Sequence, residues 1–173
     1  MHGRDYAGQN LAGWIATEKF NGHRVRWQDG ELITRFGNKL PAPSWFTAGI
    51  PDVWIDMELF ASRAGGHDEV TSLLRRGDWR KLSLIPFDLP NVSRGYLSRN
   101  MTLFTLDLPE DCQPCEPCRL GDNEEAFCML SGVEKKGGEG LMLHHPDAHY
   151  SSGKVRTLLK LFPSMGHLVL QAA

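Results

Sequence analysis

The chain has 173 residues, with 19 Lys plus Arg against 21 Asp plus Glu, and its formal net charge is −2. Hydrophobic residues make up 41% and charged residues 23%, which is typical of a folded domain and excludes a disordered, collagen-like or coiled-coil chain. No apolar run approaches the roughly 18 residues of a membrane span, and the start of the chain lacks the apolar stretch of a secretory signal. We therefore expect a cytoplasmic protein that does not bind membranes.

The first half of the chain has the pattern of an antiparallel, meandering sheet. The expected strands cover residues 13–19, 23–27, 31–36, 53–60 and 82–89. Segments rich in Gly, Pro, Asn and Asp separate most of these runs. The sequence Gln28-Asp29-Gly30 predicts a tight hairpin turn between the second strand and the third.

Two helices and three further strands complete the expected elements. Residues 67–76 and 122–136 each begin with acidic residues, end with basic ones and are followed by glycine, as the helix dipole and C-terminal capping favour. Strand-like runs follow at residues 140–145, 155–162 and 167–171. We expect one α+β domain over the whole chain, 1–173, with two packed antiparallel sheets flanked by helices.

A lysine at a strand end marks the first segment that could carry chemistry. Lys19 follows an apolar strand, and Gly22 lies three residues further on. A lysine nucleophile must be neutral to attack, which requires a desolvated site or neighbouring cations. Taken alone, the segment is also typical of a solvated strand edge. Four later strands or loops each carry one further polar or aromatic residue among apolar neighbours, namely Glu58, Phe87, Glu139 and Lys160.

Taken together and in this order, the segments resemble the motifs of one enzyme family. The chain resembles the nucleotidyltransferase domain of ATP-dependent DNA ligases, most closely the small bacterial and phage enzymes, from about residue 13 to residue 162. The matching segments are the lysine motif at 18–24, the basic motif at 34–38 with 43–46, the DGELW-like segment at 56–60, FDLP at 87–90, and EGLML at 139–143 with Leu158-Leu159-Lys160. The resemblance implies an ATP-grasp-like nucleotidyltransferase fold.

The resemblance also implies catalytic roles. Lys19 would attack the α-phosphate of ATP to give lysyl-AMP, and the AMP would pass to the 5′-phosphate of nicked duplex DNA before the phosphodiester bond forms. Glu139 would hold Mg²⁺, the expected metal ion. Lys160 would neutralise charge that develops on the α-phosphate.

Five further residues would bind the nucleotide or phosphate. Glu18 belongs to the lysine motif, Glu58 would accept hydrogen bonds from the ribose hydroxyls, and Phe87 would stack on adenine. Arg24 and Arg35 would donate to phosphate oxygens, and the 5′-phosphate of the nick is assigned to Arg35.

The chain departs from the family pattern at three places. Asn21 replaces the usual aspartate, which is compatible with loading of AMP but removes an acid implicated in later steps. Phe162 replaces the second lysine of the last motif, and thereby a cation of the phosphate pocket. Only residues 163–173 follow, too few for the five strands of an OB fold, so we expect no OB-fold domain. Either a separate chain supplies its function, or the chain is a truncated core, or full sealing activity has been lost.

The cysteines form a cluster outside the family pattern. They are Cys112, Cys115, Cys118 and Cys128. Their spacing allows a tetrathiolate zinc site, although the usual second CxxC pair is missing. The alternative is a set of reduced cysteines in a loop, or an adventitious disulfide.

Two other functions remain open at this point. An RNA ligase or RNA-capping enzyme shares the lysine motif and tolerates other residues at position 21. A degenerate, non-catalytic protein that binds nicks or nucleotides would account for Asn21, Phe162 and the missing OB fold. The intact Lys19, Glu58 and Glu139 argue against the degenerate protein.

Overall fold

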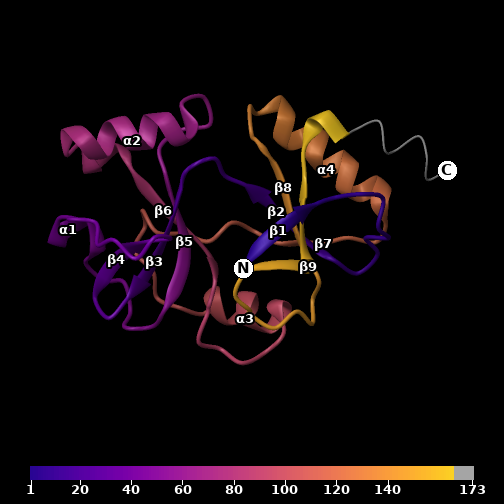
Figure 1. The fold of residues 1–173 in the computed structure, drawn as a ribbon, viewed down its shortest axis with the longest axis horizontal. Coiled ribbons are helices and arrows are strands. Elements are labelled where there is room, and N and C mark those ends of the chain that lie inside the picture. Colours follow the sequence, from indigo (N-terminus) through magenta and orange to yellow (C-terminus); the bar gives the residue numbers. More distant parts are fainter. Residues whose placement is uncertain (166–173) are drawn as a thin grey trace. The chain divides into compact units, whose positions relative to one another are not determined.

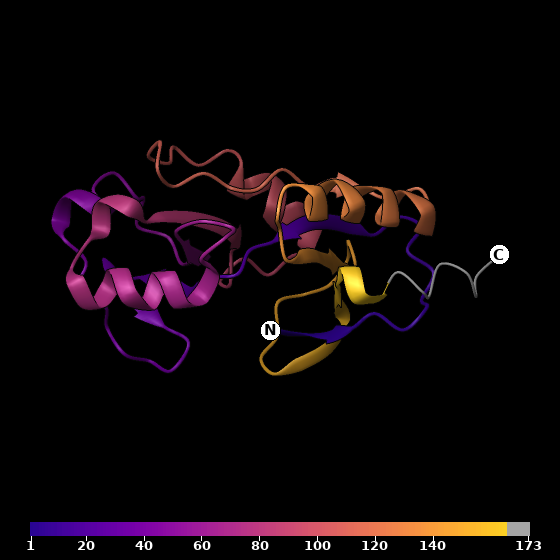
Figure 2. The same ribbon diagram turned by 90° about the horizontal axis from the view of Figure 1, so that it is seen from above.

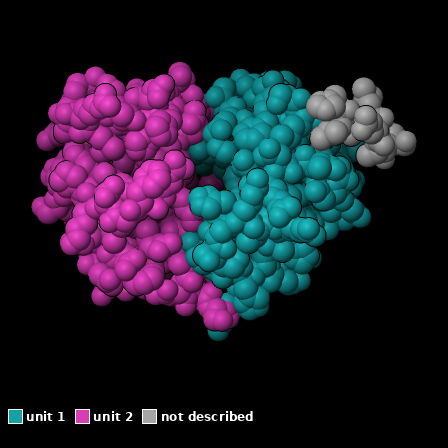
Figure 3. Space-filling view, viewed as in Figure 1, with its two compact units in different colours: residues 1–20, 94–98, 116–173 teal, residues 21–93, 99–115 magenta. Residues whose placement is uncertain are grey.

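The computed structural model describes residues 1–165 and divides into two compact units, each with its own sheet and core (Figure 3). Within the described part of the chain, unit 1 comprises residues 1–20, 94–98 and 116–165, and unit 2 comprises residues 21–93 and 99–115. Neither unit is a single stretch of chain. The strand expected at 167–171 lies outside the described residues.

Unit 1 is built on a five-stranded sheet in the order β1-β9-β8-β2-β7 (Figure 1). Its strands are β1 (His2–Asp5), β2 (Ile15–Lys19), β7 (Cys118–Arg119), β8 (Gly140–His144) and β9 (Lys154–Leu161). All neighbouring strands are antiparallel except β1 and β9, which run parallel. The sheet is therefore mixed, whereas the sequence predicted antiparallel pairing throughout. The reason is β1, whose four residues include no apolar side chain that would mark a strand.

The helix expected at 122–136 is confirmed as α4 (Asn123–Lys135), which lies along the sheet of unit 1 (Figure 2). The carboxylate of Asp122 caps it by accepting a hydrogen bond from the backbone N–H of Glu125 at 2.9 Å. Its buried residues repeat at helical spacing and pack in one core with apolar residues of β2, β8 and β9. They are Ala126, Leu130 and Val133.

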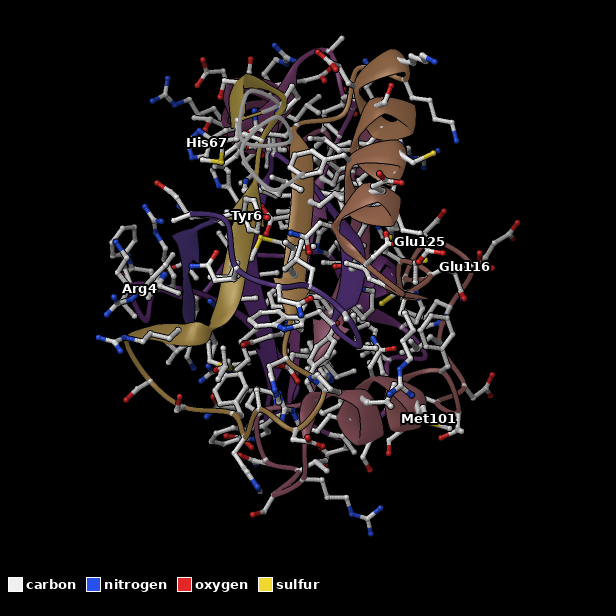
Figure 4. All side chains as sticks on the ribbon, turned by 90° about the vertical axis from the view of Figure 1, so that its right-hand side faces the viewer. Arg4, Tyr6, His67, Met101, Glu116 and Glu125 are labelled. Carbon is white, nitrogen blue, oxygen red and sulfur yellow. The ribbon has the colours of Figure 1, made fainter. Side chains whose placement is uncertain are left out.

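The edge strand β1 is anchored by the residue that follows it. Figure 4 shows Arg4 extending away from the sheet and Tyr6 beside β9. Tyr6 is 3% exposed, its backbone N–H donates to the carbonyl of Lys160, and its ring meets Phe127 of α4 edge-on. The Tyr6 hydroxyl accepts a hydrogen bond from Asn123 Nδ2 at 2.9 Å. Burial raises the pKa of Tyr6, so the phenol stays neutral in this contact.

Unit 2 is built on a four-stranded antiparallel sheet in the order β4-β3-β5-β6. Its strands are β3 (His23–Gln28), β4 (Glu31–Thr34), β5 (Ile55–Phe60) and β6 (Ser83–Asp88). The expected hairpin turn is confirmed between β3 and β4, where Asp29 has φ +53° and Gly30 has φ +77°. Two central residues with positive φ define a turn whose twist suits a two-residue hairpin.

One face of this sheet is apolar and the other is charged. Ile55, Met57 and Leu59 of β5 are buried in the core of unit 2, together with residues of α2 (Gly66–Arg76). The alternating residue Glu58 therefore lies on the opposite face of the strand.

The helix expected at 67–76 is confirmed as α2, and Gly77 ends it in the left-handed conformation. The shorter elements are α1 (Ser44–Thr47) and η1 (Trp79–Lys81).

Helix α3 (Tyr96–Leu103) was not expected from the sequence, and a buried ion pair explains why. Arg99 is 0% exposed, and its guanidinium donates to both carboxylate oxygens of Asp88, from Nε at 2.6 Å and from Nη2 at 3.0 Å. A buried arginine interrupts the apolar repeat by which an amphipathic helix is identified.

Within residues 1–165, no helix is long and apolar enough to cross a bilayer.

The ion pair makes unit 2 sensitive to loss of either partner. We expect Arg99→Met to lower the free energy of unfolding by about 3–5 kcal/mol, because the Asp88 carboxylate would be left buried without its cation. Urea denaturation followed by tryptophan fluorescence measures this change. Arg75→Met, at an exposed position near the end of α2, is the matched control and should change stability little. Equal effects of the two substitutions would contradict the prediction.

Candidate active site

The register of β2 and β8 brings Lys19 next to Glu139. Lys19 is the last residue of β2 and pairs with Gly140, the first residue of β8. The ammonium of Lys19 donates to Glu139 Oε2 at 2.5 Å, with the two side chains 21% and 29% exposed. The nucleophile predicted from the sequence therefore lies at a strand end, partly shielded and held by a carboxylate.

Glycines allow the strands to close around this lysine. A Cβ atom on Gly140 would lie 2.4 Å from the carbonyl oxygen of Leu161, and the φ of Gly140 is +156°. A Cβ atom on Gly138 would lie 2.9 Å from Glu18 Oε1. This short distance shows that the carboxylate of Glu18 lies beside the loop that leads to Glu139. The Glu18 side chain is half-buried there.

Lys160 lies in the same sheet, in β9, and pairs with Met142 of β8. Its ammonium is 3.0 Å from Asp5 Oδ1. The ring centroid of Phe162 is 5.7 Å from Lys160 Nζ and 5.8 Å from Lys19 Nζ. Unit 1 thus brings three predicted residues, Lys19, Glu139 and Lys160, to one sheet. Both lysines lie within 6 Å of the centroid of the Phe162 ring, at a position that the sequence had marked only as a lost cation.

The charged face of unit 2 is organised around Asp56. This carboxylate is 1% exposed and accepts from Arg24 Nη2 at 2.5 Å and from Arg26 Nε at 2.9 Å. Sequence reasoning had quoted Asp56 only as part of a motif and had assigned it no role. The alternation of Asp56 and Glu58 with buried Met57 was the available signal, because residues two apart share a face of a strand.

The remaining predicted nucleotide-binding residues of this face lie beside Arg24. Arg24 pairs in register with Glu58 across β3 and β5, and its guanidinium carbon is 5.4 Å from the ring centroid of Phe87. Glu58 Oε1 accepts a hydrogen bond from the backbone N–H of Gly22 at 3.0 Å. Unit 2 therefore brings together a cation, an aromatic ring and a carboxylate.

Arg35 lies in the turn after β4 rather than among these residues. The hydroxyl of Thr34 accepts from the backbone N–H of Asn38, and Gly37 has φ +85°. The Arg35 guanidinium carbon is 4.7 Å from the ring centroid of Phe36, which is 75% exposed. The Arg35 side chain is thus presented at an exposed turn.

His23 joins β3 to α2. Its Nε2 is 2.9 Å from Thr71 Oγ1, and its ring centroid is 4.1 Å from that of His67. The Thr71 hydroxyl donates to the carbonyl of His67, so His23 Nε2 is the donor to Thr71. Burial lowers the pKa of His23, and the positive charges of His67 and Arg35 lower it further, so the neutral ring is favoured.

The four cysteines are not assembled into a metal site. Cys112 lies in the core of unit 2, 4.0 Å from the sulfur of Met57, and burial raises its pKa to about 12. Zinc binds the thiolate, which this burial disfavours. Cys118 and Cys128 are exposed and Cys115 is intermediate. Among residues 1–165, no group of three or more His, Cys, Asp and Glu side chains is placed to hold a metal ion.

Comparison with known proteins identifies the fold and the family. The DNA ligase of Haemophilus influenzae is 30% identical over 167 residues, which are 93% of this chain and 62% of that protein. The solved structure of a Lig E DNA ligase, described as binding DNA with a minimal scaffold, matches with a TM-score of 0.80 and 33% identity over 94% of this chain and 69% of that one. A mycobacterial DNA ligase D, solved with ATP and MES, shares the fold with a TM-score of 0.69 at 19% identity over 93% of this chain and 60% of that one.

The fold is therefore that of the nucleotidyltransferase domain of DNA ligases. This chain belongs to the DNA ligase family, which confirms the resemblance inferred from its motifs. It spans about 62% of the length of the curated relative. No protein-family model matches the chain. The roles of the individual site residues stay predictions.

Gly22 offers a test of the geometry around Glu58. A Cβ atom at this position would lie 2.2 Å from the carbonyl oxygen of Leu59 and 3.1 Å from Glu58 Cγ. We expect Gly22→Ala to lower the free energy of unfolding by about 1–3 kcal/mol, because backbone must move to make room. Gly132→Ala, where nothing lies within 4 Å, is the control and should raise it by about 0.5–1 kcal/mol in a helix. Thermal denaturation of both variants measures their stability relative to wild type. A Gly22→Ala variant as stable as wild type would contradict the prediction.

Thiol chemistry tests the placement of Cys112. We expect an alkylating reagent at pH 8 to modify Cys115, Cys118 and Cys128 in the folded protein and to spare Cys112, which is 2% exposed. Mass spectrometry of peptides counts the modified sites, and the reaction in urea shows that all four thiols can react. Equal reactivity of Cys112, or stoichiometric zinc that protects the four thiols together, would show that the structure places these cysteines wrongly.

Proposed function

We propose that this chain is an ATP-dependent DNA ligase that forms a lysyl-AMP intermediate on Lys19 and transfers the AMP to the 5′-phosphate of nicked duplex DNA. The observation that carries the proposal is the position of Lys19, at the end of β2 within 2.5 Å of Glu139. Its place in a family motif and the relatives named DNA ligase support the same assignment.

The first step makes one bond and breaks one. Nζ of Lys19 donates its lone pair to the α-phosphorus of ATP, an N–P bond forms, and the P–O bond to pyrophosphate breaks. The proton that Nζ releases passes to solvent, which reaches a side chain that is 21% exposed. In the second step, an oxygen of the DNA 5′-phosphate attacks the same phosphorus, the N–P bond breaks, and the Lys19 amine leaves and takes up a proton from solvent. Lys160 supplies positive charge for the negative charge that develops during transfer.

The charged face of unit 2 fits the nucleoside part of ATP. The Glu58 carboxylate accepts from Gly22 through one oxygen, and carboxylates have further lone pairs for ribose hydroxyls. The ring of Phe87 offers an aromatic face of the kind on which a base stacks. Asp56 holds the guanidinium of Arg24 in a fixed orientation, which favours donation to phosphate oxygens.

Glu139 fits a Mg²⁺ ion. A carboxylate oxygen is a ligand that Mg²⁺ prefers, and this ion usually takes one or two carboxylates together with phosphate oxygens and water. When bound, the metal ion would supply charge neutralisation at the phosphates. Because the Lys19 ammonium already pairs with Glu139, the two cations would compete for one carboxylate.

Nicked duplex DNA as the substrate and a cytoplasmic location belong to the same proposal. The exposed Arg35 is the residue we assign to the 5′-phosphate at the nick. Sealing of the nick is proposed separately from loading with AMP, because the chain spans 62% of the length of the curated relative.

Loading with labelled AMP tests the first step. We expect wild-type protein, incubated with α-labelled ATP and Mg²⁺, to retain label through denaturing electrophoresis and to gain the mass of one AMP. Lys19→Ala should lose all label, because the nucleophile is gone, whereas Lys136→Ala, at an exposed lysine that caps α4, should load normally. Folded wild-type protein that binds ATP but takes up no label would favour a non-catalytic nucleotide-binding protein.

The nucleic-acid substrate is tested with the loaded protein. AMP should transfer to nicked DNA and not to nicked RNA of the same sequence when the two compete. Preferential transfer to RNA would assign the chain to RNA ligation instead.

A further inference from the structure

Phe162 lies where the active-site strands of unit 1 end. It follows β9 directly, and the last residue of β9, Leu161, pairs with Leu141 of β8. The ring packs against Gly140, since a Cβ atom on that glycine would lie 3.3 Å from Phe162 Cδ1. The Phe162 carbonyl accepts from the backbone N–H of Met165 at 2.9 Å. The ring therefore lies against the backbone of β8 at Gly140, and the main chain of Phe162 is held by Met165.

Both lysines of the proposed reaction meet this ring. Lys19 Nζ is 5.8 Å and Lys160 Nζ 5.7 Å from its centroid, within the roughly 6 Å over which a ring face attracts an ammonium group. Each lysine also has its own carboxylate, Glu139 for Lys19 and Asp5 for Lys160. An ammonium that contacts both a carboxylate and a ring has less freedom to move on its flexible stem than one in solvent.

The aromatic ring attracts both ammonium groups, whereas a third cation at this position would repel them. Two ammonium groups near one another repel, and a cation at position 162 would add to the repulsion. The negative face of a ring attracts both groups. The departure from the family motif is thus chemically different from a simple loss of charge.

We infer that Phe162 is a positioning residue that orients Lys19 and Lys160 toward the same phosphate. This inference rests on the proposed adenylylation at Lys19. Phe162 does not itself contact the reacting atoms. It acts through the two lysines, and its contribution is retained by any aromatic ring that fits the space.

Two substitutions separate orientation from space filling. Phe162→Leu keeps an apolar side chain but removes the ring, and Phe162→Tyr keeps the ring. We expect Phe162→Leu to lower the rate of AMP loading at saturating ATP by about tenfold through loss of the two ring contacts, with a smaller change in KM for ATP. Phe162→Tyr should stay within about twofold of wild type. Equal rates of AMP loading for Phe162→Leu and Phe162→Tyr would overturn the inference. A fall in loading rate that parallels a fall in the melting temperature of the variant would also overturn it.

A readout without catalysis keeps the inference distinct from the proposed function. In protein labelled with ¹³C-lysine, the ring should shift the side-chain Hε resonances of Lys19 and Lys160 upfield, and Phe162→Leu should abolish both shifts. Lys136 is the unaffected control. Shifts that disappear in Phe162→Leu, in a protein that does not load AMP, would support the positioning of the lysines and refute the ligase activity. Resonances that do not change would overturn the inference even if loading is normal.

Discussion

The antiparallel pairing of β2 with β8 is the constraint on which unit 1 depends. It joins residue 19 to residue 140, and so places Lys19, the proposed nucleophile, beside the carboxylate of Glu139, which lies 120 residues away along the chain. The close approach of β9 to Gly140 completes the arrangement, because only a glycine leaves room for the carbonyl of Leu161. The chemistry of Lys19 is thus determined by strand register rather than by a local loop.

Much of the candidate site could be predicted because apolar and polar residues alternate along a strand and so identify its two faces. The alternation in residues 55–60 separates a buried apolar face from a charged one, and Glu58 was assigned correctly to a strand on that basis. Partners distant in sequence could not be found in this way. Asp5 precedes Lys160 by 155 residues, and nothing local links the two. Aromatic contacts such as that of Phe162 with two lysines likewise depend on the assembled sheet.

The elements that sequence reasoning missed share a physical cause. Strand β1 has no apolar residue and is specified by its pairing with β9 and by the buried Tyr6 that follows it. Helix α3 buries an arginine, whose desolvation is offset by Asp88 on another element. The cysteine cluster misled for the opposite reason, since Cys112 is spaced like a metal ligand but packs as a small apolar side chain.

The interleaving of the two units has a consequence for synthesis of the protein. The last residue of unit 2 is residue 115, whereas strand β2 of unit 1 has to wait for its partners β7 and β8, which are made after that residue. Domains form as their residues emerge from the ribosome, and pairing between distant segments is slow. The nascent chain therefore carries strand Ile15–Lys19, whose first three residues are buried in the finished sheet, without its partner strands until late in synthesis. Completion of the unit 1 sheet is therefore a late step in the synthesis of this chain.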